Sequence, residues 1–118
     1  MATNNALFSD MCKPQYLERL QQIFSEKQAT VVSTTYCGYC NKAKKLLEKE
    51  GVEFREIMLD EIYGEDQMEV ANCIYGKSQR FVPMIYMNQA KVGGYGELYQ
   101  LSKDGQIKST TQTQAWMK

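Results

Sequence analysis

Cys37 and Cys40 lie two residues apart, at the boundary between a strand-like and a helix-like segment of the chain. The preceding segment, 29–34, is short and rich in β-branched residues, which is typical of a strand. From about residue 40, apolar residues recur at helical spacing until Gly51, a residue suited to follow a helix end. The sequence therefore predicts an α/β fold in which the cysteine pair lies at the start of a helix.

The rest of the chain alternates between helical and strand patterns and predicts a single domain over residues 1–118, with its core at about 14–103. One helical crossover joins the first two strands, which should therefore be parallel, whereas a hairpin around Asn88-Gln89 makes the last two antiparallel. We expect a loose arm at 1–12 and a tail at 106–118 that is flexible, or helical near Trp116. The other expected elements are helices at about 14–26, at 64–75 and around Leu98 and Leu101 up to Asp104-Gly105, and strands at 52–58 (with Phe54 inward), 82–87 and 90–92.

The absence of histidine from all 118 residues removes several classes of mechanism. It excludes Ser-His-Asp and Cys-His catalytic arrangements and zinc sites that need imidazole. Fourteen basic and fourteen acidic side chains cancel, so no overall field indicates nucleic acid or an anionic membrane as a partner. The first ten residues lack the basic and apolar regions of a secretory signal, and no apolar run would span a bilayer, so we expect a cytoplasmic protein.

The place of the cysteine pair at the start of a helix predicts which thiol is reactive. A thiolate at Cys37 would face the unpaired N–H groups of a helix start, which lower a thiol pKa from about 8.5 into a range of roughly 3.5–7.5. Cys40 follows one helical turn later, turned inward and close enough for a disulfide. Cys37 is thus the predicted nucleophile and Cys40 the resolving thiol. Lys42, Lys44 and Lys45 either form a solvated helix face or raise the positive potential near Cys37.

The other two cysteines, Cys12 and Cys73, are isolated in the sequence. We expect them to be incidental, with Cys73 packed as a small hydrophobic residue. A zinc site would need two further ligands at matching spacing. Redox chemistry at Cys37 and Cys40 is therefore favoured over a zinc site or a purely structural disulfide.

Three segments occur in a fixed order along the chain: Thr35-Tyr36-Cys37-Gly38-Tyr39-Cys40, Arg80-Phe81-Val82-Pro83 and Gly93-Gly94. Together they resemble the active site, the Thr-Val-Pro element and the Gly-Gly turn of the glutaredoxin family, over about residues 14–103. This resemblance implies a thioredoxin-like fold, with a four-stranded mixed sheet flanked by helices. The implied activity is glutathione-dependent reduction of protein disulfides and glutathione mixed disulfides.

The resemblance also implies roles in glutathione binding. Pro83 would be a cis proline facing Cys37, and the Val82 backbone would pair with the glutathione cysteine as an added strand does. Arg80, with Gln79 and Lys77, would bind the glycine carboxylate. The other implied contacts are Tyr39 beside the cysteine pair, Gly94 near the γ-glutamyl end and Glu97 at the γ-glutamyl ammonium.

The sequence departs from the family pattern at three places. Thr34 replaces a lysine, and Tyr95-Gly96-Glu97 replaces Ser/Thr-Asp, so two expected contacts to glutathione are altered. Gly38 replaces a proline, which resembles members that hold a [2Fe–2S] cluster between two protomers. Cys37 would then be a cluster ligand, with one cysteine and one glutathione from each chain.

The favoured hypothesis is a monomeric dithiol glutaredoxin acting on disulfide-containing or glutathionylated proteins. Three alternatives stay open: a [2Fe–2S] carrier or sensor that is a dimer, a thioredoxin-like reductase that does not use glutathione, and a binding module with an inert disulfide.

Overall fold

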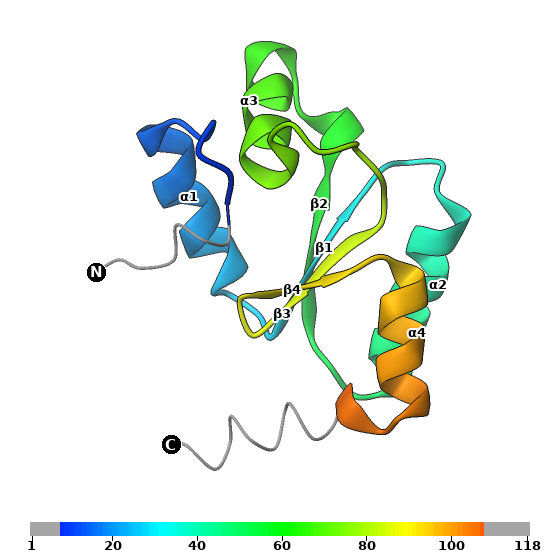
Figure 1. The fold of residues 1–118 in the computed structure, drawn as a ribbon. Helices are drawn as coiled ribbons and strands as arrows, with labels where there is room; N and C mark the ends of the chain where they lie inside the picture. The colour runs from blue at the N-terminus through cyan, green and yellow to red at the C-terminus, as the bar shows by residue number, and fades with distance from the viewer. Residues whose placement is uncertain (1–7, 108–118) are drawn as a thin grey trace.

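The computed structural model describes residues 8–107. The predicted order of elements is confirmed, with most boundaries within about two residues of those expected from the sequence (Figure 1). The short 3₁₀ helix η2 was not predicted. The elements are α1 (Pro14–Phe24), β1 (Ala29–Ser33), α2 (Gly38–Lys49), β2 (Phe54–Met58), η2 (Leu59–Glu61), α3 (Gly64–Tyr75), β3 (Met84–Met87), β4 (Ala90–Gly93) and α4 (Tyr95–Lys103).

The four strands form one mixed sheet in the order β2-β1-β3-β4. β1 pairs parallel with β2, and β3 pairs antiparallel with both β1 and β4, as the crossover and the hairpin predicted. Asn88 and Gln89 have φ values of 54° and 65°, the left-handed conformation that a type I′ hairpin turn requires. The sheet is therefore the thioredoxin-like arrangement expected from the sequence.

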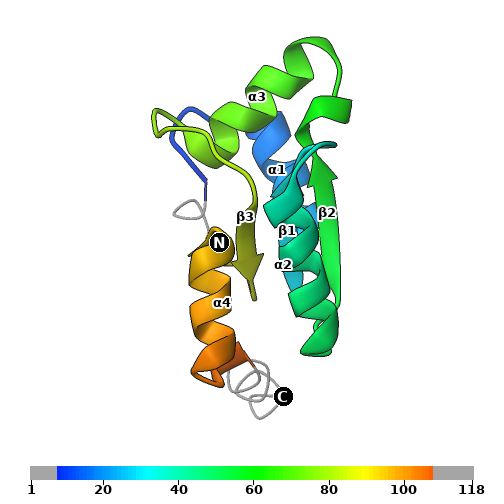
Figure 2. The ribbon, with the colours of Figure 1, turned by 90° about the vertical axis from the view of Figure 1, so that its right-hand side faces the viewer.

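Helices cover both faces of the sheet: α1 and α3 pack on one side, and α2 and α4 on the other (Figure 1). Figure 2 shows α2 and α4 running along the same face. Adjacent residues of β1 point to opposite faces. Val32 packs with Leu20 and Phe24 of α1, whereas Val31 packs with Leu47 of α2. The predicted inward position of Phe54 is confirmed by its packing against the α2/α4 cluster.

Residues 8–12 differ from the loose arm expected at 1–12. Phe8 is buried and meets Phe24 edge-to-face, with ring centroids 4.9 Å apart. Cys12 forms a disulfide with Cys73 of α3, so the expectation that the two cysteines are incidental is wrong, whereas the predicted packing of Cys73 in the core is confirmed. The sequence did not reveal this pair because its members are 61 residues apart and meet only through the docking of the arm on α3.

The start of the expected C-terminal tail is also ordered, since Ile107 is buried in the α2/α4 cluster. The predictions for residues 1–7 and 108–118, including a helix near Trp116, lie outside the described residues. Within residues 8–107, no helix is both long and apolar enough to cross a membrane.

Candidate active site

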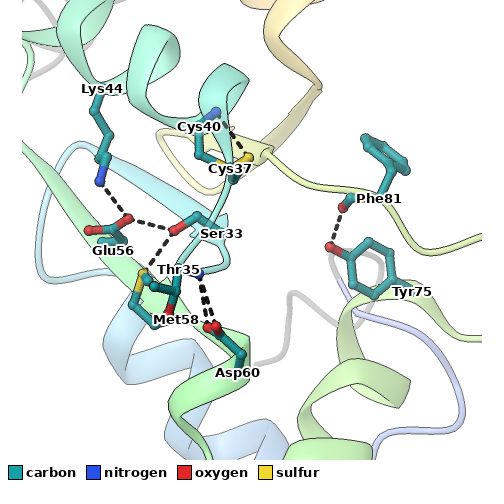
Figure 3. Close-up of a disulfide and its surroundings, with 10 residues drawn as sticks. All are labelled: Ser33, Thr35, Cys37, Cys40, Lys44, Glu56, Met58, Asp60, Tyr75 and Phe81. Atoms are coloured by element: carbon teal, nitrogen blue, oxygen red, sulfur yellow. Dashed lines mark hydrogen bonds and ion pairs between the residues drawn. A yellow bond between two sulfur atoms is a disulfide. The ribbon is translucent and has the colours of Figure 1, made fainter.

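The cysteine pair lies where β1 leads into α2 (Figure 3). Cys37 is the N-cap of α2, with extended backbone (φ −136°, ψ 103°), and its Sγ accepts a hydrogen bond from the N–H of Cys40 at 3.1 Å. The two residues form a disulfide. Cys37 is half-buried, whereas Cys40 is 1% exposed. The predicted strand–turn–helix geometry, with one accessible and one inward cysteine, is therefore confirmed.

Asp60 of η2 holds the active-site turn by hydrogen bonds to its backbone. Both of its carboxylate oxygens accept from the backbone N–H of Thr35, at 3.0 and 3.1 Å. Hydrogen bonds from the Thr35 hydroxyl and then from its N–H hold the pKa of Asp60 below the ordinary value. Sequence analysis missed Asp60. One signal in the sequence could have indicated it. Asp60 follows the C-terminal end of β2, and the C-terminal ends of the parallel strands β1 and β2 lie at the same edge of the sheet.

A polar cluster of Ser33, Lys44 and Glu56 lies close to the turn (Figure 3). The Glu56 Oε2 atom accepts from Ser33 Oγ at 2.5 Å and from Lys44 Nζ at 2.9 Å. Burial by itself would raise the pKa of Glu56, but the hydrogen bonds from Lys44 and Ser33 outweigh it and lower the pKa. The charge of Lys44 is therefore balanced locally. Lys42 lies over the Tyr39 ring, with Nζ 5.0 Å from its centroid.

A groove beside the turn brings together several predicted glutathione-binding residues. The Val82–Pro83 peptide bond is cis, as the resemblance implied. Tyr39, Val82, Pro83 and Gly94 line one groove of about 290 Å³, although they come from three separate parts of the chain. Sequence analysis did not assign its other lining residues to the site, although all three lie within or beside the quoted motifs: Phe81, Tyr95 and Gly96.

The loop 76–83, between α3 and β3, carries the predicted carboxylate ligands. Lys77, Gln79 and Arg80 are all exposed, and none of them lines the groove. Tyr75, at the end of α3, supports this loop: its hydroxyl donates to the carbonyl oxygen of Phe81 at 2.5 Å. Burial raises the pKa of Tyr75 to about 12, while the Arg80 charge acts in the opposite direction. The sequence predicted the helix that ends at Tyr75 but no role for this residue at the site.

Glu97 lies at the Gly-Gly turn but has a structural task there. Its Oε1 accepts from the backbone N–H of Gly94 at 2.9 Å, which caps the start of α4. Gly93 has a φ of +124°, and a Cβ at this position would lie 3.1 Å from the Glu97 side chain. Glycine at 93 therefore permits both the turn and the close approach of Glu97.

Comparisons with known proteins agree with this geometry. The glutaredoxin family model matches residues 29–92, more than half of the chain. A glutaredoxin of Pseudomonas aeruginosa is 32% identical over 77 residues, which cover 65% of this chain and 87% of that protein. Mitochondrial glutaredoxin-2 of mouse is 28% identical over 92 residues, 77% of this chain but only 58% of the mouse protein. The crystal structure of a buckwheat glutaredoxin–glutathione complex superposes with a TM-score of 0.70 at 27% identity, covering 92% of both chains.

Proposed function

Because the chain belongs to the glutaredoxin family of thiol oxidoreductases, we propose that it reduces protein disulfides and glutathione mixed disulfides with glutathione as the reductant. The observation that carries this proposal is the arrangement of the cysteine pair. Cys37 Sγ is 3.1 Å from an N–H donor at the start of α2, and Cys40 lies behind it at 1% exposure. A buried second thiol beside an accessible first one suits an attacking and a resolving role.

The reaction would begin with the Cys37 thiolate attacking the glutathione sulfur of a glutathionylated protein. The mixed disulfide breaks, the protein sulfur leaves as a thiolate and takes a proton, and Cys37 now carries glutathione. A second glutathione thiolate then attacks that glutathione sulfur, which releases the Cys37 thiolate and glutathione disulfide. For a protein disulfide, the Cys37 thiolate attacks one sulfur and the other leaves as a thiolate. The Cys40 thiolate then attacks Cys37 Sγ, which releases the second protein sulfur as a thiolate and forms the Cys37–Cys40 bond. Two glutathiones reduce that bond in turn and leave as glutathione disulfide.

The groove beside the turn would hold glutathione during these steps. The Val82 backbone would pair with the glutathione cysteine, between the Tyr39 ring and the Gly94 turn. Arg80, Gln79 and Lys77 would bind the glycine carboxylate from the loop side. Glu97 Oε1 already caps α4, so its second oxygen would meet the γ-glutamyl ammonium. The buckwheat relative, solved in complex with glutathione, supports this assignment.

Two serine variants test the roles of the cysteines. We expect Cys40→Ser to keep deglutathionylation of a glutathionylated peptide and to lose reduction of protein disulfides, whereas Cys37→Ser loses both. Full activity of Cys37→Ser would refute the assignment. The reductant is tested by coupling turnover to glutathione with glutathione reductase, or to thioredoxin reductase instead. Turnover with thioredoxin reductase alone would identify a thioredoxin-like reductase.

The cytoplasmic location stays a prediction, because the relatives include mitochondrial proteins.

Gly38 favours a second role, in which two chains share a [2Fe–2S] cluster. This residue is exposed, and a Cβ on it would meet no atom within 4 Å outside its chain neighbours and its own helix backbone, so the side of the turn beside Cys37 is open. Within residues 8–107, no three metal-ligating side chains gather at one site. Cys37 of two chains and two glutathiones would supply the four thiolates, and a bound cluster would be cargo or a sensor. A colourless sample after anaerobic reconstitution would exclude this role.

A further inference from the structure

A second disulfide, Cys12–Cys73, lies outside the active site and joins the N-terminal arm (residues 8–12) to α3. We propose that this pair is a second redox site, and that its oxidised form holds the loop 76–83 in the position that binds glutathione. This inference rests on the proposed function, which assigns that loop to the substrate.

The arm makes polar contacts with the last turn of α3 as well as the covalent bond. The Ser9 N–H donates to the Cys73 carbonyl oxygen, and Ser9 Oγ donates to the Asn72 carbonyl oxygen, both at 2.8 Å. The Asn72 carbonyl oxygen also accepts from the N–H of Gly76, the C-cap of α3, at 2.9 Å, whereas carbonyl groups in the last turn of a helix generally lack an intrahelical donor, so the arm adds donors to the cap of α3. The disulfide thus fastens a segment that completes the end of this helix.

The same segment contacts the first residue of the loop. Gly76 has a φ of +58°, and a Cβ there would lie 2.8 Å from Ser9 Cβ. The arm therefore lies directly against the point where α3 gives way to the loop. If the arm moved away, Gly76 would lose the packing that limits its position.

A short series of contacts leads from Gly76 to the groove. The Ser78 N–H donates to the Tyr75 carbonyl oxygen at 2.9 Å, and the Tyr75 hydroxyl donates to the Phe81 carbonyl oxygen at 2.5 Å. Phe81 and Val82 line the groove. The arm, the end of α3 and one wall of the groove are thus connected by direct contacts, so the state of Cys12–Cys73 should affect glutathione binding more than the chemistry at Cys37.

The two sulfurs differ in accessibility. Cys73 is 0% exposed, whereas Cys12 is partly exposed. A glutathione thiolate would attack Cys12 Sγ and break the disulfide, and Cys73 would leave as a thiolate and take a proton. A second glutathione would attack the glutathione sulfur of the mixed disulfide, releasing the Cys12 thiolate and glutathione disulfide. Burial disfavours the Cys73 thiolate, so the bond should resist reduction while the arm stays packed.

The first experiment compares Cys40→Ser with Cys12→Ser/Cys40→Ser, so that the active-site disulfide is absent from both. Alkylation and mass analysis at the start of each assay establish whether Cys12–Cys73 is closed. With the bond closed, we expect a KM for a glutathionylated peptide about fivefold lower than in the double variant, with kcat nearly unchanged. Reduction of Cys40→Ser should raise its KM to the same level, and reoxidation should restore it. Equal KM values for the closed and open states would overturn the proposal.

A second measurement does not depend on turnover. Backbone amides of residues 76–82 should exchange hydrogen faster when Cys12–Cys73 is reduced, while those of the β3–β4 turn keep their rate. Unchanged exchange in the loop would also overturn the proposal. If the protein does not turn over glutathionylated peptides at all, the proposed function fails, and the exchange measurement still decides whether the disulfide controls the loop.

A pair of matched substitutions controls for general loss of stability. Ser9→Ala removes the hydroxyl donor to Asn72 and keeps the disulfide. Ser25→Ala removes a serine hydroxyl bond of the same length that is exposed and local, from Ser25 Oγ to the Gln22 carbonyl oxygen at 2.8 Å, at the end of α1. We expect Ser9→Ala to raise the KM and Ser25→Ala to leave it unchanged. Equal KM values for the two variants would contradict a specific role for the arm.

Discussion

Removing the Tyr75 hydroxyl should weaken glutathione binding without changing the chemistry at Cys37. Tyr75→Phe keeps a ring that is 4% exposed and deletes the donor to the Phe81 carbonyl oxygen. A neutral hydrogen bond contributes about 0.5–1.5 kcal/mol net. The bond is only partly buried, so water can replace the lost donor and the lower part of that range applies. If the free energy of substrate binding becomes less favourable by about 0.5–1 kcal/mol, KM rises roughly two- to fivefold.

The assay measures KM and kcat for a glutathionylated peptide, together with the free energy of unfolding in urea. Tyr63→Phe is the matched control, since Tyr63 is 88% exposed and the substitution is identical. We expect a higher KM and an unchanged kcat in Tyr75→Phe, with neither changed in the control. An unchanged KM, or a loss confined to kcat, would refute the inference that Tyr75 positions the loop.

The pH dependence of unfolding gives an independent check on the same hydroxyl. The pKa of Tyr75 is raised from 10.0 to about 12 in the folded protein. A raised pKa means that its contribution to stability is complete below pH 10 and is lost as the pH rises toward 12. The difference in unfolding free energy between the wild type and Tyr75→Phe should therefore be constant from neutral pH to about pH 10 and shrink above it.

Three other predictions concern the active-site turn and the start of α4. Because its pKa is lowered in the folded protein, the Asp60 carboxylate should stabilise the protein at pH values above the ordinary carboxyl pKa of about 4, and this effect should be lost at lower pH. Asp60→Asn should remove this pH dependence of the unfolding free energy in urea. A pH profile like that of the wild type would contradict the prediction. Gly96→Asp, at a position where a Cβ would meet no atom within 4 Å outside its chain neighbours and its own helix backbone, should lower the KM for a glutathionylated peptide more than Gly96→Ser does. Equal values would argue against a new contact with the γ-glutamyl ammonium. Lys42→Ala and Lys45→Ala should each shift the Cys37 thiol pKa by less than about 0.5, measured from alkylation rates against pH, because exposed charges interact weakly; a larger shift would assign these lysines an electrostatic role.

Features encoded within a short stretch of sequence were predicted well. The β-branched run of β1 is buried on both faces, and Gly51 ends the α2 region with a φ of +74°. The crossover fixed β1 and β2 as parallel, and the cis bond before Pro83 followed from the resemblance. In each case the physical signal lies in residues next to one another or in a motif of fixed spacing.

Contacts between distant segments were not predicted. Cys12 meets Cys73, Asp60 meets Thr35 and the Tyr75 hydroxyl meets the Phe81 carbonyl only after the helices have packed. A tyrosine on an apolar helix face looks the same in the sequence whether its hydroxyl is free or holds a loop. The sequence therefore predicted the place of the cysteine pair at the start of α2, but not the residues that hold the turn and the loop in place.

Two departures from the family pattern should have opposite effects on a Cys37 thiolate. Thr34 stands where the family has a lysine, the chain has no histidine, and the charge of Lys44 is balanced by Glu56. Gly38, in contrast, is the first residue of α2 and keeps the backbone N–H that a proline there would lack. Backbone donors at the start of α2, with Cys40 N–H at 3.1 Å, would then supply most of the stabilisation. Such donors are fixed by the helix, so the reactivity of Cys37 should follow the integrity of its first turn.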